Sequence, residues 1–386
     1  MTNKKLSAVL VALFATASAF IPGGAATAAY RFSDFQGKPP VHVFRSAEKA
    51  PSGVTPAEIK KIYNIPGYGG RGTIALIEAY DDATMESDLA VFDKQYDLPA
   101  CTTANGCFEK HKMATATVAN SGWAMETSLD VEWAHAIAPT AKILLVEAKT
   151  QSGANLLGAI DYASSRSDVV AVSMSWGGPE FSDELSYDSH FTNKANPVMV
   201  FFAASGDNGT GASWPAASPA VIGVGGTSLE LTAAGALISE SAWAGSGGGV
   251  SAYEKEPAYQ AAYKIAKAGG MRAIPDVSYD ADPKSGYSIY VTGGVPVTSA
   301  TVAKKATGVW YTVGGTSAGA PQWAAIQALG GSASLSKFYA DKASTSTLKF
   351  FRDITSGSNG TCQYYCDARK RYDYVTGLGS PQTTKF

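Results

Sequence analysis

Five short apolar runs place the strongest constraint on the fold of this 386-residue chain. They lie at residues 73–80, 142–148, 169–175, 197–205 and 220–226. Each is hydrophobic at successive positions rather than at alternate ones, which is typical of strands in a parallel sheet that is covered on both faces.

Helix-like segments alternate with these runs, near residues 86–96, 122–137, 154–164 and 181–193, and a later one spans roughly 317–329. This alternation predicts an α/β fold, with a parallel β-sheet flanked by helices on both faces. In such sheets, functional residues gather where the carboxyl ends of the strands meet the loops.

The N-terminal residues indicate export. Lys4 and Lys5 precede an apolar run at 6–21, and Ala26-Thr27-Ala28 offers a small-x-small cleavage site, so residues 1–28 read as a signal peptide. The alternative is a retained N-terminal anchor. No later stretch approaches the roughly 20 apolar residues of a membrane-spanning helix, so we expect a secreted protein with no membrane partner.

The remaining chain divides at about residue 55. Residues 29–54 contain Lys38-Pro39-Pro40 and predict a short leader or linker, and residues 55–386 predict one folded domain. Cleavage after Ala28 removes two lysines and no acids, so the net charge of −2 becomes −4. Such a mild charge gives no indication of a nucleic-acid partner.

The four cysteines form two local pairs, Cys101 with Cys107 and Cys362 with Cys366. In an exported protein, close pairs predict small disulfide loops. A metal site that uses both pairs is the alternative, although the spacings differ from the common zinc pattern.

One serine has the setting of a nucleophile. Ser317 follows a Gly-Gly-Thr run and precedes the last helix-like segment, with small residues on both sides. A serine hydroxyl needs a base that accepts its proton. The four histidines lie in no catalytic-looking setting; they are His42, His111, His135 and His190.

Carboxyl groups offer another base. If residues 122–137 are helical, Glu126 and Asp130 share one face at i and i+4, among apolar neighbours that indicate a packed helix. Two buried carboxyls raise each other's proton affinity and can share a proton. A solvated acidic face with incidental spacing is the alternative.

Two further acids lie at predicted strand ends. Asp207 lies between glycines in AASGDNGTG, and a protonated aspartic acid there could donate a hydrogen bond to an oxyanion. An ordinary Gly-rich turn is the alternative. Glu78 ends an apolar strand, where it could extend the proton chain or be a simple strand-end residue.

Four motifs together resemble the sedolisins, the serine-carboxyl peptidases. They are GTSAGAP at 315–321, ETSLD at 126–130, SMSWGGPE at 173–180 and ASGDNG at 204–209. The resemblance extends from about Thr55 to the C-terminus and implies a subtilisin-like fold. The E-x-x-x-D helix together with S-G-D is its specific part.

The resemblance assigns roles by motif. It implies Ser317 as the nucleophile and Glu126 as the general base. It implies Asp130 as the residue that orients Glu126, and Asp207 as the oxyanion donor. A relay of carboxyls, rather than an imidazole, would then activate the serine.

Two further implications concern the surroundings of this site. The resemblance places Glu78 and Trp176 behind the two acids, in an extended hydrogen-bond chain. Members of the family usually carry a long N-terminal prodomain that assists folding and blocks the site, and residues 29–54 are too few for such a domain.

The C-terminal segments resemble the family's calcium site. FRDITSG at 351–357 and RYDYVTGLGSP at 371–381 carry the resemblance, and it implies one Ca²⁺ held by oxygen atoms. The matching positions are Asp353, Ile354, Arg369, Arg371 and Asp373. The family commonly has glycine at the two arginine positions. An ordinary polar loop is the alternative.

These observations predict a secreted serine-type endopeptidase that hydrolyses proteins and peptides at acidic pH, and we expect a monomer. One alternative is a subtilisin-type protease that uses one of the histidines. The other is a non-catalytic secreted binding protein of the same fold.

Overall fold

The computed structural model describes residues 30–115, 118–293, 308–340 and 350–386. The predicted signal peptide, residues 1–28, lies outside the described residues. Within the described ranges, no helix combines the length and apolarity needed to cross a bilayer.

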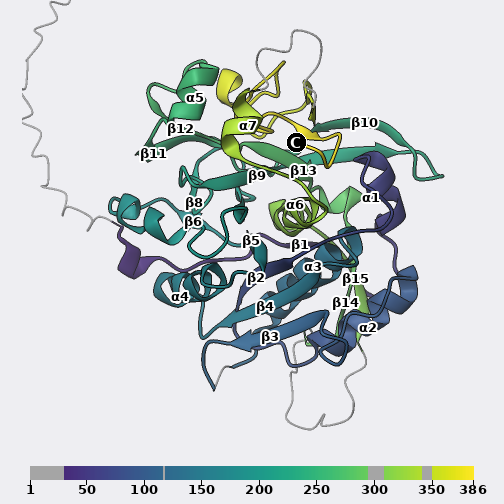
Figure 1. The fold of residues 1–386 in the computed structure, drawn as a ribbon. Helices are drawn as coiled ribbons and strands as arrows, with labels where there is room; N and C mark the ends of the chain where they lie inside the picture. Colours follow the sequence, from purple (N-terminus) through teal and green to yellow (C-terminus); the bar gives the residue numbers. More distant parts are fainter. Residues whose placement is uncertain (1–29, 116–117, 294–307, 341–349) are drawn as a thin grey trace, which may run out of the picture.

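An eight-stranded sheet forms the centre of the molecule, in the order β10-β9-β7-β5-β2-β4-β3 with β13 beside β9 (Figure 1). Its strands are β2 (Thr73–Ala79), β3 (Phe108–Lys112), β4 (Lys142–Ala148), β5 (Val169–Met174), β7 (Val200–Ala204), β9 (Val221–Leu231), β10 (Leu237–Ala242) and β13 (Val277–Asp280). All neighbouring strands run parallel except β10 and β9. The five apolar runs are therefore confirmed as adjacent strands of one parallel sheet.

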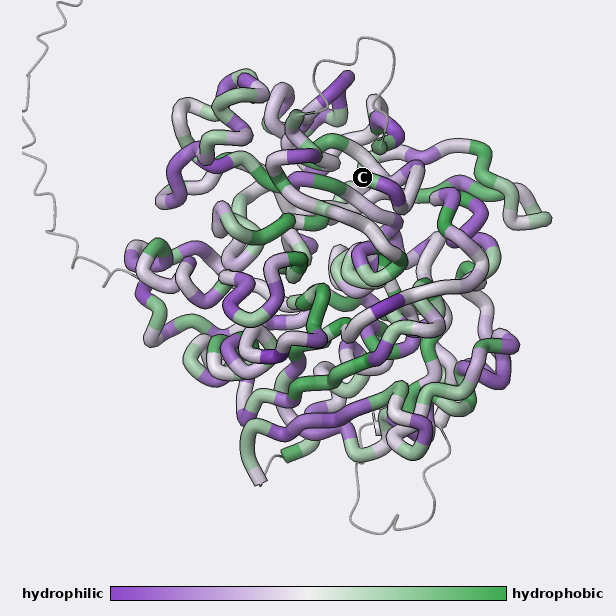
Figure 2. Tube along the Cα trace, viewed as in Figure 1, coloured by the Kyte–Doolittle hydropathy of each residue, from purple (hydrophilic) through white to green (hydrophobic). Residues whose placement is uncertain are grey.

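Helices cover both faces of this sheet, as predicted. The principal helices are α2 (Met85–Tyr96), α3 (Ser121–Ile137), α4 (Gly153–Ser164) and α6 (Gly319–Ala328). In β2, Ile74 and Leu76 belong to the core beneath α3 and α6, whereas Ala75 and Ile77 belong to the core beneath α4. Figure 2 shows that β4 is mostly hydrophobic, whereas β3 at the edge is mostly hydrophilic.

One helix prediction is wrong. Residues 181–193 form only a 3₁₀-helix, η2 (Glu184–His190). This segment is rich in Ser, Asp and Asn, which compete with helical hydrogen bonds by bonding to nearby backbone groups. Here the Glu184 carboxylate accepts from the backbone N–H of Phe181 at 2.9 Å, so the side chain caps a tight turn.

A smaller antiparallel sheet lies beside the central one, in the order β1-β15-β14. Its strands are β1 (His42–Glu48), β14 (Tyr287–Val291) and β15 (Val309–Gly314). Three two-stranded pairs complete the strands: β6 (Gly178–Pro179) with β8 (Ser213–Trp214), β11 (Gly249–Lys255) with β12 (Met271–Ile274), and β16 (Phe351–Arg352) with β17 (Ser380–Pro381). The remaining α-helices of the described residues are α1 (Pro56–Ile62), α5 (Ala258–Tyr263) and α7 (Leu335–Ala340).

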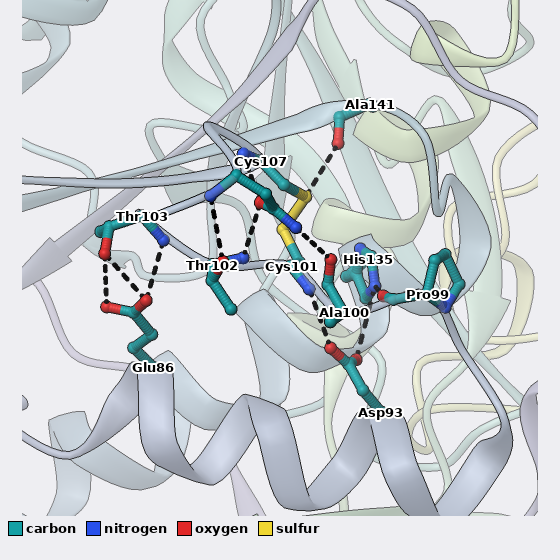
Figure 3. Close-up of a disulfide and its surroundings, with 11 residues drawn as sticks. Glu86, Asp93, Pro99, Ala100, Cys101, Thr102, Thr103, Cys107, His135 and Ala141 are labelled. Carbon is teal, nitrogen blue, oxygen red and sulfur yellow. Dashed lines mark hydrogen bonds and ion pairs between the residues drawn. A yellow bond between two sulfur atoms is a disulfide. The ribbon is translucent and has the colours of Figure 1, made fainter.

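Both predicted disulfides form, Cys101–Cys107 and Cys362–Cys366. Figure 3 shows the first beside His135, whose Nε2 contacts the Pro99 carbonyl at 2.8 Å. Because the sulfur atoms are bonded to each other, they are not available as thiolate ligands, and the alternative of a metal site using both pairs is excluded.

Candidate active site

Ser317 lies where β15 turns into α6. Gly315, at φ +133°, begins a 3₁₀ turn, η4 (Thr316–Ala318), that leads directly into the helix. This backbone region favours glycine. A side chain at Gly319 would meet Val224 at 2.6 Å, so the small residues around Ser317 allow α6 to pack closely on the sheet. Ser317 is fully buried, and its carbonyl accepts from Ser175 Oγ at 3.1 Å.

Helix α3 carries Glu126 and Asp130 into the core. Asn120 caps its N-terminus by accepting from the backbone N–H groups of Gly122 and Trp123. Both carboxyls are fully buried, so the alternative of a solvated acidic face is excluded. Glu78, at the end of β2, is fully buried as well.

These three carboxyls form one interacting group. Burial raises the pKa of Glu126 well above its usual range, the charges of Asp130 and Asp207 add to the rise, and the Ser317 hydroxyl opposes it. Burial likewise raises the pKa of Glu78, with contributions from Asp130 and Glu126. The structure therefore brings the three acids that the sequence nominated close enough to interact electrostatically, with Ser317 near Glu126. No hydrogen bond within the usual distance joins their side chains in the described part of the chain.

Asp130 is the third titrating member of this group. Burial raises its pKa to about 7, while the side chains of Ser175, Glu78 and Glu126 oppose the rise. Because the three carboxyls interact strongly, they titrate as one group, and the pKa values belong to the group rather than to single residues.

Trp176 lies next to this group through the backbone. Its indole N–H donates to the carbonyl of Ile77 at 2.9 Å, and its ring is fully buried. The recorded hydrogen bond thus goes to the residue before Glu78 and not to the Glu78 carboxyl. Trp176 fixes the end of β2 rather than extending the chain of side-chain hydrogen bonds.

Asp207 lies on the other side of the nucleophile. Its Oδ1 accepts from the backbone N–H of Thr316 at 2.9 Å and from Thr316 Oγ1 at 2.7 Å. Its Oδ2 lies 3.1 Å from His42 Nε2. Burial raises the pKa of Asp207, while the hydrogen bonds from His42 and Thr316 oppose the rise.

Sequence reasoning missed the contact between His42 and Asp207. His42 belongs to β1, within the segment predicted as a leader or linker, and no local motif marks it. The other histidines have recorded partners elsewhere: His111 stacks on Tyr162, His135 contacts Pro99 and Asp93, and His190 pairs with Asp161. Among the recorded side-chain contacts of the described residues, none joins a histidine to Ser317.

Hydrogen bonds join four of the five predicted calcium positions in two pairs. The backbone N–H of Arg371 donates to both Asp353 oxygens at 2.9 and 3.0 Å, and that of Arg369 donates to Asp373 Oδ2 at 3.0 Å. Ile354 and Asp373 are almost fully buried. Arg371 has φ +67°, in the region that favours glycine.

The charges around these positions are mixed, because the positive charges of Lys370 and Arg371 act on Asp353. Among the described ion pairs, neither Asp353 nor Asp373 has a cationic side-chain partner, and the Arg369 guanidinium instead lies 3.2 Å from Asp367. A buried carboxylate without a countercharge is costly. Asp373 is buried and Asp353 is half-buried. Their carboxylates and the neighbouring backbone carbonyls offer the hard oxygen donors that calcium prefers, so the residues present fit calcium.

Comparison with known proteins gives three consistent matches. The model of the Subtilase family matches residues 82–347. Kumamolisin from Bacillus sp. (strain MN-32) is 31% identical over 87% of this chain, and Sedolisin from Pseudomonas sp. (strain 101) is 31% identical over 56% of it. The chain spans only 63% and 40% of the lengths of these two relatives.

Solved structures agree with this result. A complex of Pseudomonas sedolisin, described as a serine-carboxyl proteinase with two molecules of pseudo-iodotyrostatin, superposes with a TM-score of 0.70 at 26% identity. The match covers 86% of this chain and 96% of that one. The subtilisin-like architecture predicted from the motifs is thereby confirmed.

Proposed function

We propose that this chain is a serine-carboxyl endopeptidase that cleaves proteins and peptides at acidic pH. The proposal starts from its family, since the chain belongs to the subtilase family and, within it, to the sedolisins. The observation that carries the proposal is the buried group of Glu78, Glu126 and Asp130 beside Ser317. A plain structural core gains nothing from three uncompensated carboxyls, whereas a serine without a histidine requires a proton acceptor.

The proposed proton relay uses buried carboxyls that can share protons. With Asp130 ionised and Glu126 neutral, Ser317 attacks the peptide carbonyl while its proton passes to one oxygen of Glu126. The proton that Glu126 held moves to Asp130. The new C–O bond forms a tetrahedral intermediate, whose oxyanion accepts a hydrogen bond from protonated Asp207.

The intermediate then collapses to an acyl-enzyme. The amine departs with a proton returned through Glu126, and Asp130 is again ionised. Water attacks the ester along the same route, because its proton also passes to Glu126, and Ser317 is released. Asp130 and Glu78 act through Glu126, so they position and buffer the proton without touching the substrate.

Casein digestion from pH 3 to pH 8 tests this function. We expect digestion below pH 7 that declines towards pH 8. A maximum at pH 8 would favour a histidine-type protease, and no digestion at any pH would favour the non-catalytic alternative. We also propose that the protein is exported and acts outside the cell, which the two disulfides support.

We further propose that one Ca²⁺ binds between Asp353 and Asp373, with the backbone carbonyls of Ile354, Arg369 and Arg371. The ion would neutralise the two carboxylates and join two segments that are distant in the sequence. A ligand that binds only the folded state stabilises it by about 2.7 kcal/mol when its free concentration is 100 times Kd.

A chelator should therefore lower the melting temperature in thermal denaturation. The variant Asp353→Asn should melt lower in calcium and should no longer respond to the chelator. Asp367→Asn is the matched control, because Asp367 lies in the same loop, its side chain pairs with Arg369, and its loss should leave the response intact. Identical wild-type melting curves with and without chelator, in metal-stripped buffer, would contradict the site.

A further inference from the structure

The Cys101–Cys107 disulfide lies against a buried histidine in the last turn of helix α3 (Figure 3). One sulfur of each cysteine and one ring nitrogen of His135 all lie within 4.8 Å of one another. His135 and Cys101 are almost fully buried, whereas Cys107 is half-buried. Three side chains that can each bind a soft metal ion therefore meet at one point, which a small solute can reach past Cys107.

The hydrogen bonds of His135 leave one ring nitrogen free. Its Nε2 lies 2.8 Å from the Pro99 carbonyl oxygen, which can only accept, so Nε2 carries the hydrogen of the neutral ring. Nδ1 then holds a lone pair, and it is buried without a hydrogen-bond partner in the described part of the chain. Burial lowers the pKa of His135 to about 4, so the ring is neutral at neutral pH. Zinc-binding histidines are oriented in the same way, by a carbonyl that accepts from the other ring nitrogen.

Both cysteines are held by their backbones, independently of the bond between their sulfurs. The backbone N–H of Cys101 donates to Asp93 Oδ2 on α2 at 3.1 Å. The backbone N–H of Cys107 donates to Asn105 Oδ1 at 3.0 Å, within the small loop. The carbonyl of Cys107 accepts from the N–H of Ile143 on β4 at 2.8 Å. Reduction of the disulfide would therefore leave both sulfurs beside the imidazole.

We propose that Cys101, Cys107 and His135 form a zinc site when the disulfide is reduced, and that the disulfide is the metal-free state of the same site. A dithiol reductant supplies two electrons and two protons, so both sulfurs become thiols and the reductant leaves as its own disulfide. Zn²⁺ then binds the two sulfurs and Nδ1, and the two thiol protons pass to solvent. The fourth position of the tetrahedral ion is left for water.

The geometry and the charges of the three ligands suit this ion. Ligands of one tetrahedral zinc lie about 3.5 to 3.8 Å apart, so side-chain movements of about 1 to 2 Å bring the three atoms into place. Two thiolates balance the two charges of Zn²⁺, so the buried site carries no net charge. Thiolate and imidazole ligands select zinc, whereas calcium prefers oxygen, so the two proposed metal sites fill separately. The inference is independent of the proposed function.

Zinc binding is tested with the full chain in excess calcium, which fills the proposed calcium site. The chain is reduced with a phosphine in the absence of air and titrated with Zn²⁺ against a colour indicator at neutral pH. We expect one tightly bound Zn²⁺ in each reduced chain and none in the oxidised chain. Co²⁺ in place of Zn²⁺ should give the visible absorption bands of a tetrahedral thiolate site.

The variant His135→Gln tests the nitrogen ligand, because its amide can still donate to the Pro99 carbonyl. It should weaken zinc binding by about 100-fold or more, since the loss of an outer-shell partner alone costs about 10- to 100-fold. His111→Gln is the matched control, because His111 stacks on Tyr162 and lies outside the group. It should bind zinc like the parent chain, and circular dichroism of both variants verifies that they are folded.

Alkylation of the reduced parent chain gives a second measurement that needs no substitution. Zn²⁺ should slow the reaction of Cys101 and Cys107 with iodoacetamide by about tenfold or more, because metal-bound thiolates are shielded from the reagent. Cys362 and Cys366 are the internal control, and their rates, read by mass spectrometry of the same digest, should not change.

Three results would overturn the proposal. The first is equal zinc binding by the oxidised and reduced chains, or none by either. The second is an affinity in folded His135→Gln that matches the parent chain, or alkylation of Cys101 and Cys107 that zinc does not slow. The third is loss of the folded circular-dichroism spectrum when the chain is reduced with zinc present, because the ion is expected to bind the folded state.

Discussion

Replacing Ser317 with alanine is expected to leave a folded protein whose peptidase activity is lower by roughly four to six orders of magnitude. The reason is that the acyl-enzyme cannot form without the Oγ atom. The oxyanion donor and the binding cleft remain, so a small residual rate above that of water is expected. Rates on a chromogenic peptide, together with circular dichroism, measure both parts of this prediction.

A matched serine controls for general damage. Ser186→Ala changes an exposed serine of η2 and should keep full activity. Mass spectrometry of the parent enzyme, quenched during turnover of a slow ester substrate, should show acyl adducts on the peptide that contains Ser317. Wild-type turnover by Ser317→Ala would contradict the assignment of the nucleophile.

The second large effect concerns pH. The relay must be ionised at Asp130, whose pKa burial raises to about 7. The oxyanion donor must be protonated at Asp207, whose pKa burial also raises. Activity therefore falls on the acid side as the relay of Glu126 and Asp130 gains a proton and on the alkaline side as Asp207 loses its own. Because all of these groups are carboxyls, we expect a bell-shaped profile with its maximum on the acid side of neutrality.

Asp207→Asn separates the two limbs. The amide donates a hydrogen bond at every pH, so the decline on the alkaline side should disappear while the acid limb remains. Asp207→Ala should instead lower kcat by about 100- to 1000-fold, as the loss of one oxyanion donor does elsewhere. The two variants together distinguish the donor from a merely structural aspartate.

His42→Ala is the control for this experiment, because it removes the ion pair with Asp207 but leaves the carboxyl in place. It should retain the alkaline decline. The measurement is kcat/KM for a small peptide from pH 3 to pH 9. An alkaline limb that persists in Asp207→Asn would show that Asp207 does not supply the titrating proton.

The sequence by itself determined the central architecture. The run at 142–148 becomes β4, buried on both faces, because a parallel strand covered by helices must be apolar at successive positions. Glu126 and Asp130 are four residues apart. Both carboxyls therefore share one face as soon as this segment forms the helix α3. Ser317 was identified from its small neighbours, because a close approach of α6 to the sheet tolerates no larger side chains.

Only the tertiary structure decided which distant groups meet. The burial of Glu78 beside Asp130 depends on how α3 packs over β2, and the ion pair between His42 and Asp207 depends on β1 joining β15. Residues 35–42 carry no apolar period and include two prolines, so they resemble a linker. Their order comes from main-chain hydrogen bonds to Gln151 and Gly177 and from one buried ring, Phe35. Local sequence cannot encode such partners, because any extended segment offers the same backbone groups and only the fold brings the acceptors within reach.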